Sequence, residues 1–267
     1  MPDHKGTAQP DGPVAFPPRP RPADPKRSFG IGLPYVDLDD LTGYLVVIEG
    51  TDGVGRSTHI SLLKSWLQIK GFGVVETGWT RSNLVGKTID LAKEGHGINV
   101  LTLNLLYATD FADRLEHEII PALRSGFIVL ADRYIYTAMA RAAARYADVE
   151  WVRSLYGFAI EPDLVLYLKV ELKSLVQRVI GASGLNYWEA GMDQSPGCDP
   201  YESFCLYQSK VLREFNRLSR KFGFRNVDAR RPVEKTQLSL RKHVAGLLHI
   251  ELSQEDREVV APVWAAP

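Results

Sequence analysis

A glycine-rich segment at residues 50–58 combines the residue types needed to hold phosphate groups. Its glycines let backbone N–H groups turn around phosphate oxygens, and a helix beginning directly after it would add its positive N-terminal end. The spacing of Gly50, Gly55 and Ser57 fits the pattern G-x-x-x-x-G-K-[ST] of a phosphate-binding loop. A glycine-rich turn with chance spacing is the alternative, and the flanking elements argue against it. The residues expected to bind phosphates are Gly50, Thr51, Asp52, Gly53, Val54, Gly55, Arg56, Ser57 and Thr58.

The phosphate-binding pattern is altered at one position, because Arg56 stands where lysine is usual. Lysine is a compact point charge, whereas arginine is longer, planar and able to form two parallel hydrogen bonds. Arg56 therefore keeps the positive charge but must sit differently. We expect it to bind phosphate while stabilising a transition state less well than lysine does. The hydroxyl of Ser57 is a candidate ligand for Mg²⁺.

The rest of the chain supplies elements that can position this loop. Short apolar runs, typical of buried strands, alternate with longer helical patterns. This alternation predicts an α/β fold of the P-loop NTPase type, a parallel five-stranded sheet with helices on both faces. Ligands of such sheets bind at the carboxyl ends of the strands. We expect strands at 44–49, 74–76, 127–131, 164–168 and 224–228, and helices at about 57–70, 100–124, 134–157, 171–180 and 201–222.

Proline content separates a terminal tail from the folded domain. Nine of the 16 prolines fall in residues 1–34, and this stretch has few apolar residues to offset the entropy of ordering. We expect residues 1–40 to be disordered and partly polyproline II, either as a solvated extension or as a ligand for a proline-recognising partner. Residues 254–267 also have the composition of a disordered tail. The domain would then span 41–253.

Composition narrows the classes of function. Lys plus Arg and Asp plus Glu both number 32, so the formal net charge is zero, which argues against a partner such as nucleic acid or a membrane surface. No apolar run reaches the length of a membrane span, and the first residues have no signal-peptide core. Two cysteines, Cys198 and Cys205, exclude a disulfide scaffold and make a zinc site improbable. We expect a cytoplasmic location.

Short motifs along residues 44–248 together resemble the thymidylate kinase family. The segment EGTDGVGRST at 49–58 resembles the family pattern E-G-x-D-G-x-G-K-[ST]-T. Each of the further matches is weak, but their order and spacing are specific for the thymidylate kinase-like branch of nucleoside monophosphate kinases. They are RSNLVGK at 81–87, LLYA at 105–108, IPAL at 120–123, ADRY at 131–134, PDLVLYL at 162–168 and VDA at 227–229.

The resemblance implies an ATP-dependent kinase that uses Mg²⁺ and a nucleoside monophosphate acceptor, dTMP by default, and that forms a homodimer. Asp52 would then accept a hydrogen bond from the acceptor sugar, and Arg81 and Arg133 would hold the acceptor phosphate. Tyr107 would stack on the base, and Asp132 would act near Mg²⁺. Without the family, Asp132 and Arg133 would more often form a structural ion pair, and Tyr107 would more often be a core residue. The residues expected in catalysis are Arg56, Asp132 and Arg133.

The chain departs from the family pattern around the base and in the lid. Family members carry a base-reading arginine one turn after the stacking aromatic, where this chain has Phe111, so Phe111 becomes the expected acceptor contact and Arg114, one turn further, a second candidate. Residues 137–142 lack most of the family's polar set, which lowers the expected selectivity for thymine. The expected lid, at about 181–200, contains no Lys or Arg. It could form an ordered lid or a partner surface.

Two alternatives to the kinase hypothesis therefore stay open. Arg56 and the acidic lid favour a catalytically weak, nucleotide-binding regulatory protein, because an arginine finger is worth about 10³–10⁵ in rate. Phe111 and Ala142 favour a kinase that acts on a different phosphorylated acceptor.

Overall fold

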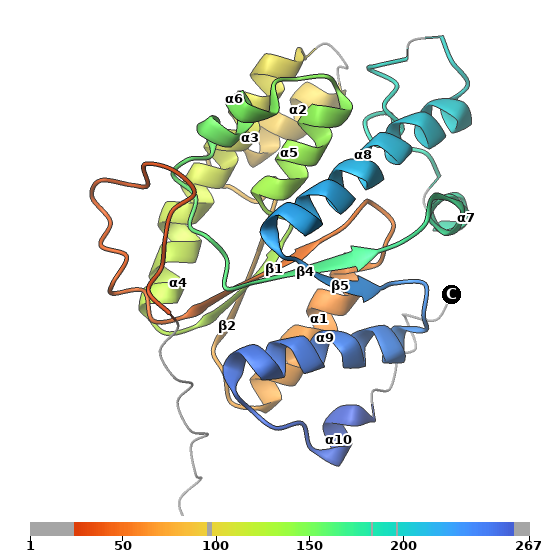
Figure 1. The fold of residues 1–267 in the computed structure, drawn as a ribbon. Helices are drawn as coiled ribbons and strands as arrows, with labels where there is room; N and C mark the ends of the chain where they lie inside the picture. Colours follow the sequence, from red (N-terminus) through yellow and green to blue (C-terminus); the bar gives the residue numbers. More distant parts are fainter. Residues whose placement is uncertain (1–23, 95–97, 183, 196, 259–267) are drawn as a thin grey trace, which may run out of the picture.

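The structure is a computed structural model that describes residues 24–94, 98–182, 184–195 and 197–258. Its centre is a parallel sheet with the strand order β2-β3-β1-β4-β5 (Figure 1). The predicted fold class is confirmed, and each strand lies within two residues of its predicted bounds. The strands are β1 (Tyr44–Glu49), β2 (Val74–Gly78), β3 (Ile128–Asp132), β4 (Leu164–Lys169) and β5 (Arg225–Asp228).

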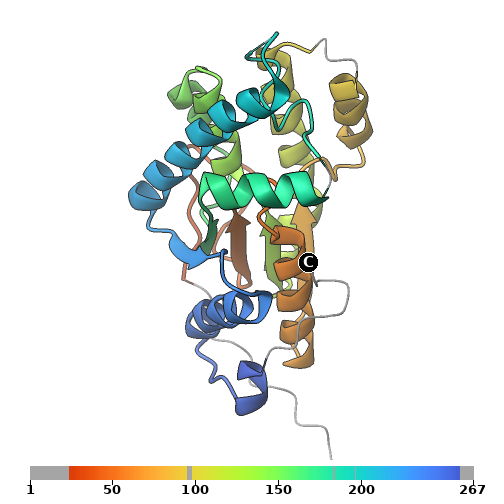
Figure 2. The same ribbon diagram turned by 90° about the vertical axis from the view of Figure 1, so that its right-hand side faces the viewer.

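Helices cover both faces of the sheet because successive residues of each buried strand point to opposite sides. Leu45 and Val47 of β1 pack into one core, and Val46 and Ile48 pack into the other. The view in Figure 2, turned by 90°, shows the sheet between the two helical layers. One layer contains α3 (Val100–Arg114), α4 (Ile120–Arg124), α5 (Ile135–Ala144), α6 (Val149–Leu155) and α8 (Pro200–Phe222); the other contains α1 (Arg56–Ile69), α7 (Leu172–Ala182) and α9 (Val233–Leu248).

Two predicted helices are divided in the structure. The helix expected at 100–124 contains a π-helical turn, η1 (Leu115–Ile119), between α3 and α4. The helix expected at 134–157 is interrupted before Asp148, whose side chain caps α6 by accepting hydrogen bonds from the backbone N–H groups of Glu150 and Trp151. The helices α2 (Gly86–Glu94) and α9 were not predicted. Among the described residues, no helix combines the length and apolar character that crossing a membrane requires.

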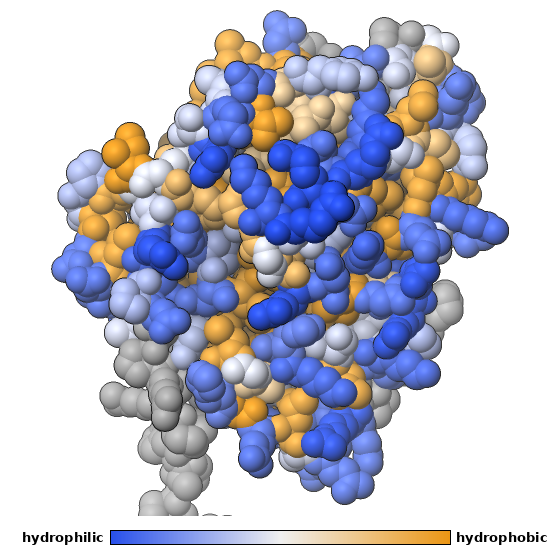
Figure 3. All heavy atoms as spheres, in the orientation of Figure 1, coloured by the Kyte–Doolittle hydropathy of each residue, from blue (hydrophilic) through white to orange (hydrophobic). Residues whose placement is uncertain are grey.

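Residues 24–40, placed in the disordered tail by their composition, pack on the domain instead. The Lys26 ammonium is buried and pairs with Asp163, and the N–H of Phe29 donates to the carbonyl of Ala159 at 3.0 Å. The side chains of Phe29, Leu33, Val36 and Leu38 pack against the core, whereas Ile31 and Tyr35 are exposed. Figure 3 shows apolar side chains at the surface in this part of the molecule. The remainder of the predicted tail, residues 1–23, lies outside the described residues.

The C-terminal prediction is also too broad, because α10 (Gln254–Arg257) lies within the tail expected at 254–267. Ser253 and Asp256 form a capping box at its start. The Asp256 carboxylate accepts hydrogen bonds from the Trp66 indole at 2.8 Å and pairs with Lys70 at 2.7 Å. These contacts anchor α10 to α1. Residues 259–267 lie outside the described residues.

Candidate functional site

The predicted phosphate-binding residues form a tight turn between β1 and α1, at the carboxyl edge of the sheet. Gly53 and Gly55 have φ values of 75° and 92°, in the left-handed region that favours glycine. A Cβ atom on Gly53 would lie 2.6 Å from a methyl carbon of Val179. The first turn of α1 begins at Arg56, directly after the loop. The loop's N–H groups and the helix N-terminus therefore meet where an anion would bind.

Arg56 is held by the loop itself. Its guanidinium donates hydrogen bonds to the backbone carbonyls of Gly50 and Thr51, and its Nε donates to Asp132 Oδ1 at 2.7 Å. The side chain is buried. Arg56 thus fills the floor of the loop with most of its donors engaged. A phosphate would have to compete with carbonyl and carboxylate acceptors for this guanidinium.

Two further arginines converge on Asp52 from the end of β3 and from α5. Arg133 pairs with Asp52 Oδ1, and Arg141 Nη2 donates to Asp52 Oδ2 at 2.7 Å. Burial and the neighbouring charge of Arg141 lower the pKa of Arg133 to about 9. The cluster therefore has positive charge in excess of Asp52. Sequence reasoning missed Arg141, although its place two turns into a helix that begins directly after Arg133 was a usable signal.

A buried carboxylate fixes the segment that carries Arg133. Glu49, the last residue of β1, accepts hydrogen bonds from the backbone N–H groups of Tyr134 and Thr137, at 2.9 and 3.2 Å, and from the Thr137 hydroxyl at 2.6 Å. Burial raises the pKa of Glu49 to about 7 against the opposing effect of these donors. Glu49 therefore ties the start of α5, and with it Arg133, to the strand that precedes the phosphate loop.

A cavity of about 670 Å³ lies beside the phosphate loop. Asp52, Arg133 and Arg141 line one part of it, and the rings of Trp79, Tyr107 and Trp188 line another. The rings of Trp79 and Tyr107 meet edge to face with centroids 5.0 Å apart. Such an arrangement can hold a ligand that has an aromatic ring at one end and an anionic group at the other. Tyr107, predicted to stack on a base, thus lines this cavity.

The prediction that Phe111 contacts the acceptor is wrong. Its ring is completely buried and lies among Trp79, Tyr134 and Tyr156, with centroid distances of 6.4, 5.0 and 5.6 Å. Phe111 is therefore part of the aromatic core on this face of the sheet. Arg114 does not reach the cavity either, because it pairs with Asp110 at 3.0 Å inside the protein.

Arg81, the second arginine expected on the acceptor phosphate, points elsewhere in this structure. Its Nη1 donates to Glu76 Oε1 at 3.0 Å, and its side chain is 46 % exposed. The loop that carries it is nevertheless fixed, since the buried carboxylate of Asp110 accepts hydrogen bonds from the N–H groups of Thr80 and Ser82 at 3.2 and 3.0 Å. Only Arg133 of the two predicted arginines lines the cavity.

The segment expected to form a lid packs beside the cavity. Trp188 donates from its indole to the backbone carbonyl of Lys93 at 3.0 Å, on the far side of the cavity. Arg145 of the loop after α5 pairs with Asp193 at 2.9 Å and also donates to the carbonyl of Trp188. A cation from outside the segment therefore pairs with one of its acidic residues, Asp193. Arg178 of α7, which sequence reasoning did not single out, donates to the Val54 carbonyl of the phosphate loop at 3.2 Å.

The residues predicted to ligate Mg²⁺ are Ser57 and Asp132. Ser57 is exposed in the first turn of α1, and Asp132, the last residue of β3, pairs with the neighbouring Arg56 at 2.7 Å. The described residues contain no group of three or more His, Cys, Asp or Glu side chains that could hold a metal ion. This donor set fits Mg²⁺, which often binds through one or two protein oxygens together with substrate phosphates rather than in a protein cage.

Comparison with known proteins agrees with the geometry. The family model described as thymidylate kinase matches residues 48–191. The chain is 36% identical over 204 residues to a protein of Saccharolobus solfataricus named probable thymidylate kinase 2. The aligned region covers 76% of this chain and 95% of that protein. It is 37% identical over 150 residues to the probable thymidylate kinase of Thermococcus gammatolerans, covering 53% of this chain and 72% of that protein. The chain therefore belongs to the thymidylate kinase family of nucleoside monophosphate kinases.

Proposed function

We propose that this kinase transfers the γ-phosphoryl group of ATP to dTMP and releases dTDP. The observation that carries this proposal is the cavity between the phosphate loop and Tyr107, which has arginines at one end and aromatic rings at the other. The relatives' names, which specify probable thymidylate kinases, support dTMP as the acceptor. By the same analogy we propose that the protein acts in the cytoplasm as a homodimer.

In this proposal the site works mainly by positioning and charge neutralisation, as phosphoryl transfer requires. The N–H groups of the loop at 50–58 hold the ATP phosphates, and Arg133 holds the acceptor phosphate. Tyr107 stacks on the acceptor base. Ser57 and Asp132 would hold Mg²⁺, which when bound neutralises charge on the ATP phosphates. Asp52 accepts a hydrogen bond from the acceptor sugar after a bound phosphate has drawn Arg133 and Arg141 away from the Asp52 carboxylate.

The direct test is release of ADP from MgATP by the full-length protein with a panel of nucleoside monophosphates. We expect turnover at or above roughly 1 s⁻¹, the low end for kinases, with dTMP and slower turnover with the others. A faster reaction with another monophosphate would reassign the acceptor. No acceptor-dependent turnover, in a protein that binds ATP by calorimetry, would contradict the proposed function.

A second candidate, a nucleotide-binding protein with little catalytic activity, is favoured by the contacts of Arg56 with the loop carbonyls and Asp132. The variant Arg56→Lys separates the two, because lysine has fewer donors with which to hold the loop and leaves Asp132 less constrained. If the site is adapted to arginine, as we propose, turnover falls at least roughly tenfold, about 1.4 kcal/mol in activation free energy. A large gain in turnover would favour the weak-enzyme alternative.

A further inference from the structure

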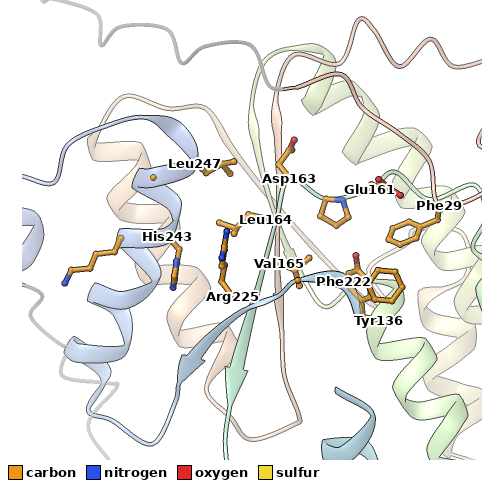
Figure 4. A pocket seen from close by; sticks show the side chains of 14 residues that line it. Phe29, Tyr136, Glu161, Asp163, Leu164, Val165, Phe222, Arg225, His243 and Leu247 are labelled. Atoms are coloured by element: carbon orange, nitrogen blue, oxygen red, sulfur yellow. The ribbon is translucent and has the colours of Figure 1, made fainter. Parts of the chain in front are cut away.

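A second cavity, of about 580 Å³, opens at the amino ends of β4 and β5, whereas the phosphate loop follows the carboxyl end of β1. Leu164 and Arg225, the first residues of β4 and β5, form its floor, and α9 and the segment around Phe29 form its sides (Figure 4). Its volume lies within the range of about 300–1,000 Å³ that small-molecule sites occupy. None of the residues assigned to the kinase site lines it.

One side of this cavity carries unpaired basic groups. Arg225, Lys242 and His243 line it, and none of the three side chains has a hydrogen-bond or ion-pair partner within the described part of the chain. Burial and the adjacent charge of Arg225 lower the pKa of His243. Arg133 and Arg145, by contrast, are each paired with a carboxylate. A group of unpaired bases against a hollow is the chemistry that recognises a phosphate or carboxylate.

The other side of the cavity is aromatic. Phe29, Tyr136 and Phe222 pack against one another, with centroid distances of 5.7 Å between Phe29 and Tyr136 and 5.2 Å between Tyr136 and Phe222. Figure 4 shows these rings across the cavity from Arg225 and His243, with Glu161 beside them. Phe29 and Phe222 are only partly buried, so a face or edge of this cluster is open to a planar ligand. The Glu161 carboxylate is 44 % exposed and can accept hydrogen bonds from hydroxyl or amino groups.

We propose that this cavity binds a small anion that carries an aromatic ring, the chemistry of a nucleoside phosphate, with its anionic group on Arg225, Lys242 and His243 and its ring against Phe29 and Phe222. The proposal does not rest on the kinase function, because no residue is shared between the two sites. Hydroxyl or amino groups between ring and phosphate would be recognised by Glu161. An anion beside His243 offsets the charge of Arg225 and raises the pKa of that imidazole.

The test follows the imidazole signal of His243 by NMR in the full-length protein, assigned by its loss in His243→Gln. This local readout separates the cavity from the kinase site, which would also bind nucleotides. The probes are AMP, phenyl phosphate, adenosine and inorganic phosphate. We expect AMP to shift the signal saturably and at least roughly tenfold more tightly than adenosine or inorganic phosphate, a difference of about 1.4 kcal/mol. If phenyl phosphate binds as tightly as AMP, the result would support a ligand that joins an aromatic ring to a phosphate and would exclude recognition of the sugar.

The matched variants are Arg225→Gln, which removes a charge from the cavity, and Lys235→Gln, which removes one from an exposed position of α9 outside it. Loss of a charge-assisted hydrogen bond should weaken AMP binding at least roughly tenfold in Arg225→Gln and leave it unchanged in Lys235→Gln. Lys242→Gln serves if Arg225→Gln does not fold, as judged by circular dichroism. The proposal is overturned if AMP leaves the His243 signal unmoved, if inorganic phosphate binds as tightly as AMP, or if a folded cavity variant binds AMP like the native chain.

Discussion

In the proposed function, the cavity beside the phosphate loop has a phosphate end and a base end, and these two ends are built in different ways. At the phosphate end, Asp52, Arg133 and Arg141 interact through charge, and Glu49 fixes the backbone that carries Arg133. At the base end, Tyr107 and Trp79 meet through ring contacts, and the buried indole N–H of Trp79 has no hydrogen-bond partner among the described residues. The first end would therefore select an anion by its charge, whereas the second would select a ring mainly by shape.

This difference indicates which part of the site can vary. A phosphate needs positive charge at a fixed place, and Arg133 and Arg141 supply positive charge at that end of the cavity. A base can be bound by stacking alone, and Phe111 lies in the core, where its ring stacks on Trp79. Loss of a hydrogen-bonding group costs selectivity more than binding. We therefore expect this enzyme to discriminate among acceptor bases less sharply than it recognises their phosphate.

The strongest way to break the phosphate end is Arg133→Ala. The variant loses the contact with the acceptor phosphate and leaves Asp52 with one arginine fewer. Removing one partner of a buried charge pair costs about 5 kcal/mol at the upper end, which corresponds to a fall of roughly 10³–10⁴-fold in kcat/KM for the acceptor. Steady-state kinetics with varied dTMP would measure it. Arg220→Ala, at an exposed position of α8, is the matched control and should leave kcat/KM unchanged.

The base end is tested by comparing two aromatic residues one turn apart on α3. Phe111→Ala empties a fully buried site and should lower the free energy of unfolding by about 3–5 kcal/mol. Tyr107→Ala removes a ring that lines the cavity, so we expect a smaller loss of stability and a higher KM for the acceptor. Urea unfolding and acceptor kinetics on both variants give the comparison. Equal losses of stability would show that Tyr107 is a core residue rather than a base contact.

The sequence predicted the parts of this architecture whose signals are local. The strands and the turn at 50–58 follow from apolar runs and glycine spacing within a few residues. Arg141 was not predicted as a site residue because its partner, Asp52, is 89 residues away in the chain. Phe111 was misassigned because motif alignment places a residue along a helix but does not say which face the core covers. The segment at 24–40 was predicted to be disordered because it contains few apolar residues. Those few residues nevertheless pack against the core of the domain, and composition alone does not show that such a surface is present.

Glu49, which ties the start of α5 to β1, gives the smallest of these expected effects. Because burial raises the pKa of Glu49 to about 7, the folded protein holds a proton on this carboxyl that the unfolded chain, with an ordinary pKa near 4.5, releases. Between these two values the folded state binds more protons than the unfolded state, so stability falls as pH rises. From pH 5 to 7.5 this group should cost roughly 2 kcal/mol. Glu49→Gln keeps an acceptor for the N–H groups of Tyr134 and Thr137 but cannot ionise, so urea unfolding at the two pH values should show a flatter dependence than in the native chain. An unchanged slope would mean that Glu49 is ionised in the folded protein, and that the start of α5 is held to β1 by a charge rather than by a neutral carboxyl.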